Sequence, residues 1–280
     1  MMKRLRKKIF ILKIIALMFL VFNITTSVQA TEFTNENNTQ VEVKDKIIKI
    51  DLKTGEQTEV DMEEIKRINR QSRGIDENGV TELEGYNPFK NAIRVNPTRS
   101  SYRTVIDDTS IFPYNTICRI LGYNSNGTAY TGSGILMGKN VVLTAAHVLY
   151  DENNNNQMYS GLTVVPGWNN GLLNNMSCYC PTVYVHQNWL DTNSYEYDWA
   201  LGVLDENLGE LTGYLGSTTS YGEQLANISV NSVGYPNDYQ NGNYQMNTPG
   251  TVTEAYDNWF KVSGVFSGGM SRRASYERRR

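Results

Sequence analysis

Short runs of apolar residues, separated by Gly, Asn, Asp, Ser and Pro, dominate the chain from about Tyr102 onwards. Some runs alternate apolar and polar positions, others are apolar throughout, and none has a long helical period. The runs are NTICRILGY, SGILMGKNVVLTAAHVL, LTVVPGW, PTVYVHQNWL, WALGVL, ISVNSVGYP and GTVTEAYDNWFKVSG. Strands of this length joined by turn residues predict an all-β sandwich or barrel.

The segment that precedes these runs, from Thr31 to about Ser100, is polar and charged. Alternation in VEVKDKIIKIDLKTGE predicts a hairpin, and MEEIKRINRQS predicts a short helix. Because the segment lacks the aromatic density of the strand-rich region after it, we interpret residues 31–104 as a pro-segment. A flexible N-terminal extension is the alternative.

The first thirty residues have the pattern of an export signal. A basic stretch is followed by an apolar run and a V-x-A site that ends at Ala30, so we expect a signal peptide over residues 1–30. A retained membrane anchor is the alternative, but the run is shorter than the ~20 residues that a span needs. The sequence therefore predicts a secreted protein with no membrane contact after signal cleavage.

Composition and charge narrow the class of protein. A hydrophobic content of 40% and an aromatic content of 11% supply enough apolar material for one or two packed domains. Residues 101–271 contain 4 Lys or Arg against 14 Asp or Glu, whereas the last nine residues hold 5 Arg and one Glu. Proteins bind nucleic acid largely through positively charged side chains, which are scarce in residues 101–271. We therefore expect no nucleic-acid partner.

Three cysteines, Cys118, Cys178 and Cys180, leave the disulfide question open. Export permits a disulfide, but an odd number leaves one thiol over and the pairing is not fixed by sequence. Cys178 and Cys180 are separated by one residue and have no further Cys or His set around them, which disfavours zinc. We expect a structural bridge or free thiols, and no metal.

Histidine chemistry has two candidates, His147 and His186. His147 follows the apolar strand Asn140-Val141-Val142-Leu143 and the small residues Ala145 and Ala146. Small residues allow close packing, so the ring is held at a strand end in the fixed orientation that a general base needs.

Several motifs together resemble one family. GSGILMGKNVVLTAAHVLYD, TNSYEYDWALGVLDENLGELTGYLG, SVGYPNDYQNGNYQMNTPGTV and TVIDDTSIFPY resemble segments of the chymotrypsin-like serine proteases, specifically of the bacterial glutamyl endopeptidase (V8-like) branch. The resemblance implies two antiparallel β-barrels over residues 105–280 and a monomer that needs no cofactor. It also implies protein or peptide substrates, with a preference for Glu on the acyl side of the cleaved bond.

The resemblance assigns roles to three residues. His147 corresponds to the general base, Asp198 in Tyr197-Asp198-Trp199 to the acid that orients it, and Ser271 to the nucleophile. His186 corresponds to a structural position. The nearby carboxylates have turn-like surroundings and are interpreted as solvated surface groups; they are Asp191, Glu196 and Asp205.

The sequence departs from the family around the serine. Gly269-Met270-Ser271 fits the expected turn, but Arg272-Arg273-Ala274 stands where the family has Gly-Gly-Pro. An Asp-Thr pair expected upstream is absent, and the strands expected downstream do not follow. We therefore expect an incomplete second barrel and an aberrant basic tail over residues 272–280, produced by a frameshift or sequencing error; a natural basic tail is the alternative.

Two further expectations concern maturation and the competing functions. The resemblance places the maturation cleavage near Arg99 to Arg103, with Val105 as the new N-terminus and a contributor to recognition of acidic substrates. The alternatives to a protease are a catalytically inactive remnant and a secreted non-enzymatic binding protein, such as an adhesin. In these alternatives His147 has no catalytic role.

Overall fold

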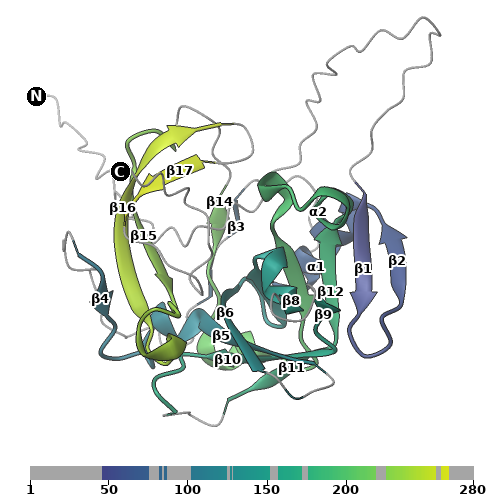
Figure 1. Cartoon of the computed structure of the whole chain (residues 1–280), viewed down its shortest axis with the longest axis horizontal. Helices are drawn as coiled ribbons and strands as arrows, with labels where there is room; N and C mark the ends of the chain where they lie inside the picture. Colours follow the sequence, from purple (N-terminus) through teal and green to yellow (C-terminus); the bar gives the residue numbers. More distant parts are fainter. Residues whose placement is uncertain are drawn as a thin grey trace, which may run out of the picture.

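The computed structural model describes residues 46–75, 82–83, 85–86, 102–124, 127, 129–151, 157–171, 176–218, 225–256 and 260–264. Most of the ordered elements are antiparallel β-strands, and the helices are short. Figure 1 shows two groups of strands, with β15, β16 and β17 on one side of the molecule and β1, β2 and β12 on the other. The all-β prediction is confirmed.

The larger sheet contains nine strands. Their order across the sheet is β11 (Cys178–Cys180), β10 (Gly161–Pro166), β5 (Ile117–Tyr123), β6 (Ala129–Leu136), β7 (Val141–Thr144), β13 (Ala200–Val203), β12 (Thr182–His186), β1 (Ile47–Asp51) and β2 (Gln57–Val60). Every pair of neighbours in it is antiparallel.

The path of strands returns on itself through one segment. β11 and β12 are separated by Pro181 alone, and they pair with β10 and with β13 respectively. Residues 178–186 therefore close the path between the two sides of the sheet. This is the connectivity that a barrel requires, because a barrel is a sheet whose first and last strands meet. Apolar side chains fill its interior, including Ile120, Leu136 and Val164.

The second sheet contains four strands in the described part of the chain. They are β4 (Thr104–Val105), β15 (Ser229–Gly234), β16 (Met246–Ala255) and β17 (Phe260–Ser263). The Tyr235 backbone N–H donates to Ser133 Oγ at 2.8 Å, and the buried Tyr235 hydroxyl lies 3.3 Å from the Ile117 carbonyl oxygen, to which it donates. These contacts fix the second sheet against the first.

Two smaller strand pairs lie outside these sheets. β3 (Glu82–Leu83) pairs with β14 (Ser217–Thr218), and β8 (Tyr150–Asp151) pairs with β9 (Gln157–Met158). The first pair joins the N-terminal segment to the region that follows β13.

The N-terminal helix occurs where the sequence predicted it, whereas the hairpin lies further along the chain than predicted: β1 falls within the predicted stretch 41–56 but β2 follows it. β1 and β2 form the hairpin, and α1 (Met62–Ser72) coincides with the predicted helix. Asp61 caps α1, because its side chain accepts a hydrogen bond from the Glu64 backbone N–H at 2.9 Å. For residues 46–75 the alternative of a flexible extension is wrong, since β1 pairs with β12 along its whole length.

The other helices are single turns or little more. Those that the structure describes in full are α2 (Gln187–Thr192), α3 (Leu208–Thr212) and the 3-10 turns η1 (Tyr114–Thr116), η2 (Ala146–Leu149), η3 (Tyr195–Tyr197) and η5 (Gln240–Gly242). Within the described ranges, no helix has the length and apolar character needed to cross a membrane. The predicted signal peptide and the basic tail lie outside the described residues.

Candidate active site

Two neighbouring strands bring His147 and Asp198 together. β7 and β13 are antiparallel, and Thr144 lies opposite Ala200. The last residue of β7 therefore lies opposite the first residue of β13. His147, on η2 just after β7, therefore lies beside Asp198, which follows η3 and precedes β13.

The Asp198 carboxylate holds His147 by two hydrogen bonds. Its Oδ1 accepts from the His147 backbone N–H at 2.8 Å, and its Oδ2 lies 2.7 Å from His147 Nδ1. An ionised carboxylate only accepts hydrogen bonds, so the neutral imidazole carries its proton on Nδ1 and presents the lone pair of Nε2. This arrangement can remove a proton from a hydroxyl group and then return it.

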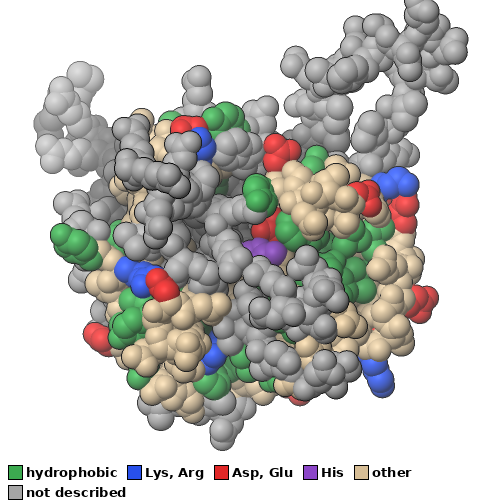
Figure 2. Space-filling model, in the orientation of Figure 1, with side chains coloured by type: hydrophobic (Ala, Val, Ile, Leu, Met, Phe, Trp, Pro, Cys, Tyr) green, Lys and Arg blue, Asp and Glu red, His purple; other side chains and the backbone are tan. Residues whose placement is uncertain are grey.

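Partial exposure keeps this pair within reach of a substrate. The side chains of His147 and Asp198 are 13% and 10% exposed. Figure 2 shows histidine surface near the centre of one face, in a hollow beside acidic side chains. The pair is therefore well shielded from solvent, which strengthens its electrostatic interaction, without being sealed inside the core.

The loop before Asp198 is supported by aromatic packing. The rings of Tyr197 and His186 stack with centroids 4.2 Å apart and planes 25° apart, and Trp199 meets His186 edge-on at 6.3 Å. Because Tyr197 and Trp199 flank Asp198, this packing restrains the backbone that carries the carboxylate. No local sequence pattern predicts this stack.

His186 has the structural position predicted for it. It is 3% exposed, and its Nδ1 accepts from the Asn188 backbone N–H at 3.0 Å, so that it caps the start of α2. A ring nitrogen that accepts this hydrogen bond is unprotonated. His186 is a packing and capping residue.

Ser271 lies outside the described residues, so the structure does not place it beside His147. In the sequence, Ser271 follows β16 and β17, and β17 ends at Ser263. The assignment of Ser271 as the nucleophile stays a prediction.

The three nearby carboxylates differ in their surroundings, and Glu196 is a half-buried residue of η3. Asp191 is exposed and accepts from Gln187 Nε2 at 2.7 Å, as expected of a surface group. Asp205 is also exposed, but its Oδ1 accepts from the Cys178 thiol, with the sulfur 2.9 Å away. Asp205 is thus a surface carboxylate, as expected, that also accepts a hydrogen bond from a buried thiol.

All three cysteines are free and buried. Burial raises the pKa of Cys180 to about 12, and burial with the hydrogen bond to Asp205 raises the pKa of Cys178 to about 12. Burial also raises the pKa of Cys118. Of the two alternatives that the sequence left open, the structure has free thiols rather than a bridge.

A match to the family described as Trypsin covers residues 110–269, more than half of the chain. The chain belongs to the trypsin family. The match begins before β5 and ends two residues short of Ser271, so it includes both His147 and Asp198. The resemblance noted in the sequence is confirmed at the level of the family.

A curated relative and several solved structures are also similar to this trypsin-family chain. An "Extracellular metalloprotease" from Bacillus subtilis (strain 168) is 28% identical over 165 residues, which cover 57% of this chain and 50% of the relative. The chain thus matches about half of the relative's length. A Glu endopeptidase in complex with MPD is 23% identical, with a TM-score of 0.47, covering 61% of this chain and 82% of that one. The protease Anisep from Arthrobacter nicotinovorans is 19% identical, with a TM-score of 0.44, covering 60% and 83%.

The name of the Bacillus relative prompts a test for a metal site. Among the residues that the structure describes, no group of three or more His, Cys, Asp or Glu side chains gathers as a metal-binding cluster. The Nδ1 atom of His147 is engaged by Asp198. The donor set of this part of the chain does not fit a catalytic zinc, which needs three protein ligands.

Proposed function

We propose that the chain is a secreted serine endopeptidase that hydrolyses peptide bonds through His147, Asp198 and Ser271. The observation that carries the proposal is the doubly hydrogen-bonded His147–Asp198 pair inside a trypsin-family match. Ser271 is included because it lies in Gly269-Met270-Ser271, which resembles the serine turn of the family.

The geometry of the pair suits acyl transfer. Nε2 of His147 takes the proton of the Ser271 hydroxyl as the oxygen attacks the substrate carbonyl carbon, and the imidazolium then gives this proton to the leaving amine. Water repeats the sequence to release the acid and restore the serine. Asp198 stabilises the imidazolium through Nδ1 and prevents the ring from turning.

The finer features of the proposal rest on the motif resemblance. We propose a preference for Glu on the acyl side of the cleaved bond, export by the signal peptide over residues 1–30, and maturation near Arg99 to Arg103. The Bacillus relative is named as extracellular, which agrees with export.

The segment at the predicted maturation site is partly described. Arg103 makes a two-pronged ion pair with Asp238, at 2.9 and 3.1 Å, and Val105 pairs with Met246 of β16. Val105, the expected new N-terminus, therefore lies beside β16 in the uncleaved chain.

A panel of peptides tests the proposal. Peptides with Glu, Gln, Asp or Lys before the scissile bond are incubated with the purified chain, and the products are identified by mass spectrometry. We expect cleavage after Glu that is lost in His147→Ala and in Ser271→Ala. A folded protein that cleaves none of the peptides favours the inactive remnant or the binding protein instead.

A further inference from the structure

The N-terminal strand β1 completes an edge of the barrel sheet. Its five residues pair with β12 from Ile47 opposite His186 to Asp51 opposite Thr182. Two further backbone hydrogen bonds extend the ladder, from the Gln187 N–H to the Lys46 carbonyl at 2.8 Å and from the Leu52 N–H to the Pro181 carbonyl at 2.9 Å.

β1 lies in line with β10, a strand of the rest of the protein from residue 102 onwards, which we call the body. β13 and Asp205 occupy one edge of the 178–186 segment, through the β12 ladder and through the Asp205 N–H that donates to the Tyr179 carbonyl. On the other edge, β10 pairs with the first part of the segment and β1 with the second. Without β1, the outer backbone groups of β12 would be left unpaired, which exposes a strand edge.

The side chains of β1 belong to the core of the body. Ile48 and Ile50, with Leu52 directly after the strand, are in the same buried cluster as Val183 and Val185 of β12. Ile47 points to the other side and joins the cluster that contains Tyr184. Ile47 and Ile50 are both 0% exposed. Loss of the strand would open both apolar surfaces to water.

Helix α1 is attached to the body at both of its ends. Near its start, the Tyr184 hydroxyl donates to Glu64 Oε1 at 3.2 Å, and at its last residue the Ser72 carbonyl accepts from the Lys139 N–H at 2.9 Å. Ser72 lies so close to Gly138 that a β-carbon at Gly138 would overlap its hydroxyl.

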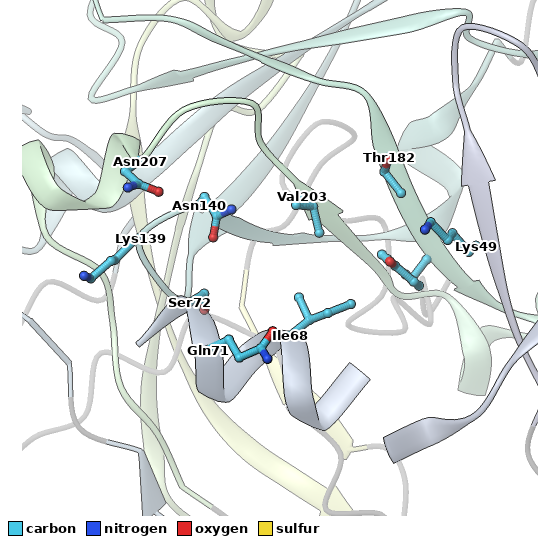
Figure 3. Close-up of a pocket in the computed structure, with 10 residues that line it drawn as sticks. Lys49, Ile68, Gln71, Ser72, Lys139, Asn140, Thr182, Val203 and Asn207 are labelled. Carbon is cyan, nitrogen blue, oxygen red and sulfur yellow. The ribbon is translucent and has the colours of Figure 1, made fainter. Parts of the chain in front are cut away.

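Between these two attachments lies a groove of about 540 Å³. Figure 3 shows Ile68 and Gln71 on one wall, from α1, and Val203 and Thr182 on the other, from the sheet. The N-terminal segment therefore supplies four of the ten residues that line this groove.

A third contact follows the helix. Arg73 is 7% exposed, and its guanidinium donates to the Leu215 carbonyl at 3.2 Å and lies 5.4 Å from the centroid of the Tyr214 ring. Beyond it, β3 pairs with β14, and Tyr86 bridges to Tyr214. Residues 46–86 thus contact the body through several separate elements. All of these contacts must break before the residues can be released.

The segment also supports the loop of the candidate site without forming it. Ile47 lies opposite His186, the ring of His186 stacks on Tyr197, and Tyr197 directly precedes Asp198.

We infer that residues 46–86 remain bound to the body after cleavage near Arg99 to Arg103, as a non-covalent subunit of the mature protein. The binding surface is the outer edge of β12 together with the turn at Gly138 and Lys139 and the backbone of Tyr214 and Leu215. This inference goes beyond the proposed function and takes from it only the maturation cleavage.

A designed cleavage site tests the inference. The recognition sequence of a site-specific protease replaces residues 90–96 in a His147→Ala background, which excludes self-cleavage in the proposed mechanism. After complete cutting, the sample is passed through a size-exclusion column in native buffer and then in denaturant. We expect the two fragments to elute together in equimolar amounts without denaturant and separately with it. Separation in native buffer, with a body that keeps its near-ultraviolet circular dichroism, overturns the inference.

A pair of matched variants adds a second test of the same contact. Ile50→Asp places a charge in the core cluster, whereas Thr58→Asp places the same charge on the exposed face of β2. We expect the cut Ile50→Asp protein to release its N-terminal fragment at least tenfold faster than wild type, and cut Thr58→Asp to behave as wild type. If Ile50→Asp fails to fold before cutting, the strand is part of the core as inferred; if it folds and retains its fragment as wild type does, the inference fails.

Association of the fragments is independent of catalysis, so the two proposals can fail separately. Peptidase activity is measured on the wild-type chain, and association of the fragments on the cut His147→Ala protein. Fragments that stay together, with a wild-type chain that cleaves none of the peptides, would contradict the proposed function alone. Fragments that separate, with a wild-type chain that cleaves the peptides, would contradict this inference alone.

Discussion

Replacing Asp198 by Asn tests the role of the carboxylate with little change of shape. Asp198 accepts from both the backbone N–H and Nδ1 of His147. Asn has a single side-chain acceptor oxygen, and its other terminal group is an NH₂ donor. If the oxygen keeps the backbone N–H, the NH₂ faces Nδ1, which must then accept, and the ring proton moves to Nε2. A ring with its proton on Nε2 cannot take the proton of a serine hydroxyl.

The expected loss is large. Fixing the wrong tautomer lowers the turnover rate by about 10⁴-fold in a triad of this geometry, which corresponds to about 5.5 kcal/mol in the activation free energy. The assay is kcat/KM on a peptide with Glu before the scissile bond, combined with ¹⁵N NMR of the His147 ring. The matched control is Asp191→Asn, a carboxylate on the exposed end of α2, for which we expect a change of less than about twofold.

Two results would refute this reasoning. One is an Asp198→Asn enzyme that loses less than tenfold in kcat/KM. The other is a ¹⁵N spectrum in which the variant's His147 ring still carries its proton on Nδ1. Either result would mean that Asp198 does not set the tautomer.

Three further predictions concern reactivity and stability. With a pKa of about 12, only a fraction of ~10⁻⁴ of Cys178 and Cys180 is ionised to the thiolate at pH 8. We therefore expect these thiols to react with a thiol reagent on the order of 10³-fold more slowly in the native protein than in urea. Similar rates in the two conditions would argue against the buried free thiols. Ile50→Ala removes a fully buried side chain and is expected to lower the free energy of unfolding by about 2–5 kcal/mol, whereas Lys53→Ala in the exposed hairpin turn should change it by less than ~0.5 kcal/mol in urea titrations. Because the native thiols hold their protons to a higher pH than unfolded thiols do, their contribution to stability is complete below about pH 8.5 and is lost as the pH rises toward 12. Urea midpoints should therefore fall from pH 8 to pH 10, and a Cys178→Ala/Cys180→Ala double variant should show a shallower fall; an unchanged slope would contradict the raised pKa values.

The sequence predicted the elements better than their partners. Hydrophobic alternation and turn residues located most strands of both sheets, but not β2, β4 or β11. The acidic first turn of MEEIKRINRQS together with Asp61 explains why α1 begins where it does. These signals are local. The proximity of His147 and Asp198 followed from the family resemblance and is explained by the register of β7 against β13.

The docking of the N-terminal segment was not predictable in the same way. Ile47 and Ile48 are adjacent, so alternation alone would leave one of them exposed, yet both faces of β1 are covered. The strand edge that accepts β1 is free because β10 begins at Gly161 and its pairing with the 178–186 segment stops at Cys180, which is a tertiary feature. The hydrogen bond from Cys178 to Asp205 and the burial of Arg73 likewise join residues far apart in sequence, with no local pattern to announce them.

Covalent labelling of the full chain with a fluorophosphonate, followed by peptide mapping, tests the proposed mechanism most directly. The reagent reports a serine hydroxyl activated by a neighbouring base, so it addresses the residue that lies outside the described part of the chain. The account predicts modification of Ser271 in the wild-type protein and none in His147→Ala. Both proteins should be folded as judged by circular dichroism, because Tyr235 and the other core side chains are unchanged. A folded wild-type protein that takes up no label, or takes it up equally with and without His147, would contradict the assignment of a serine protease.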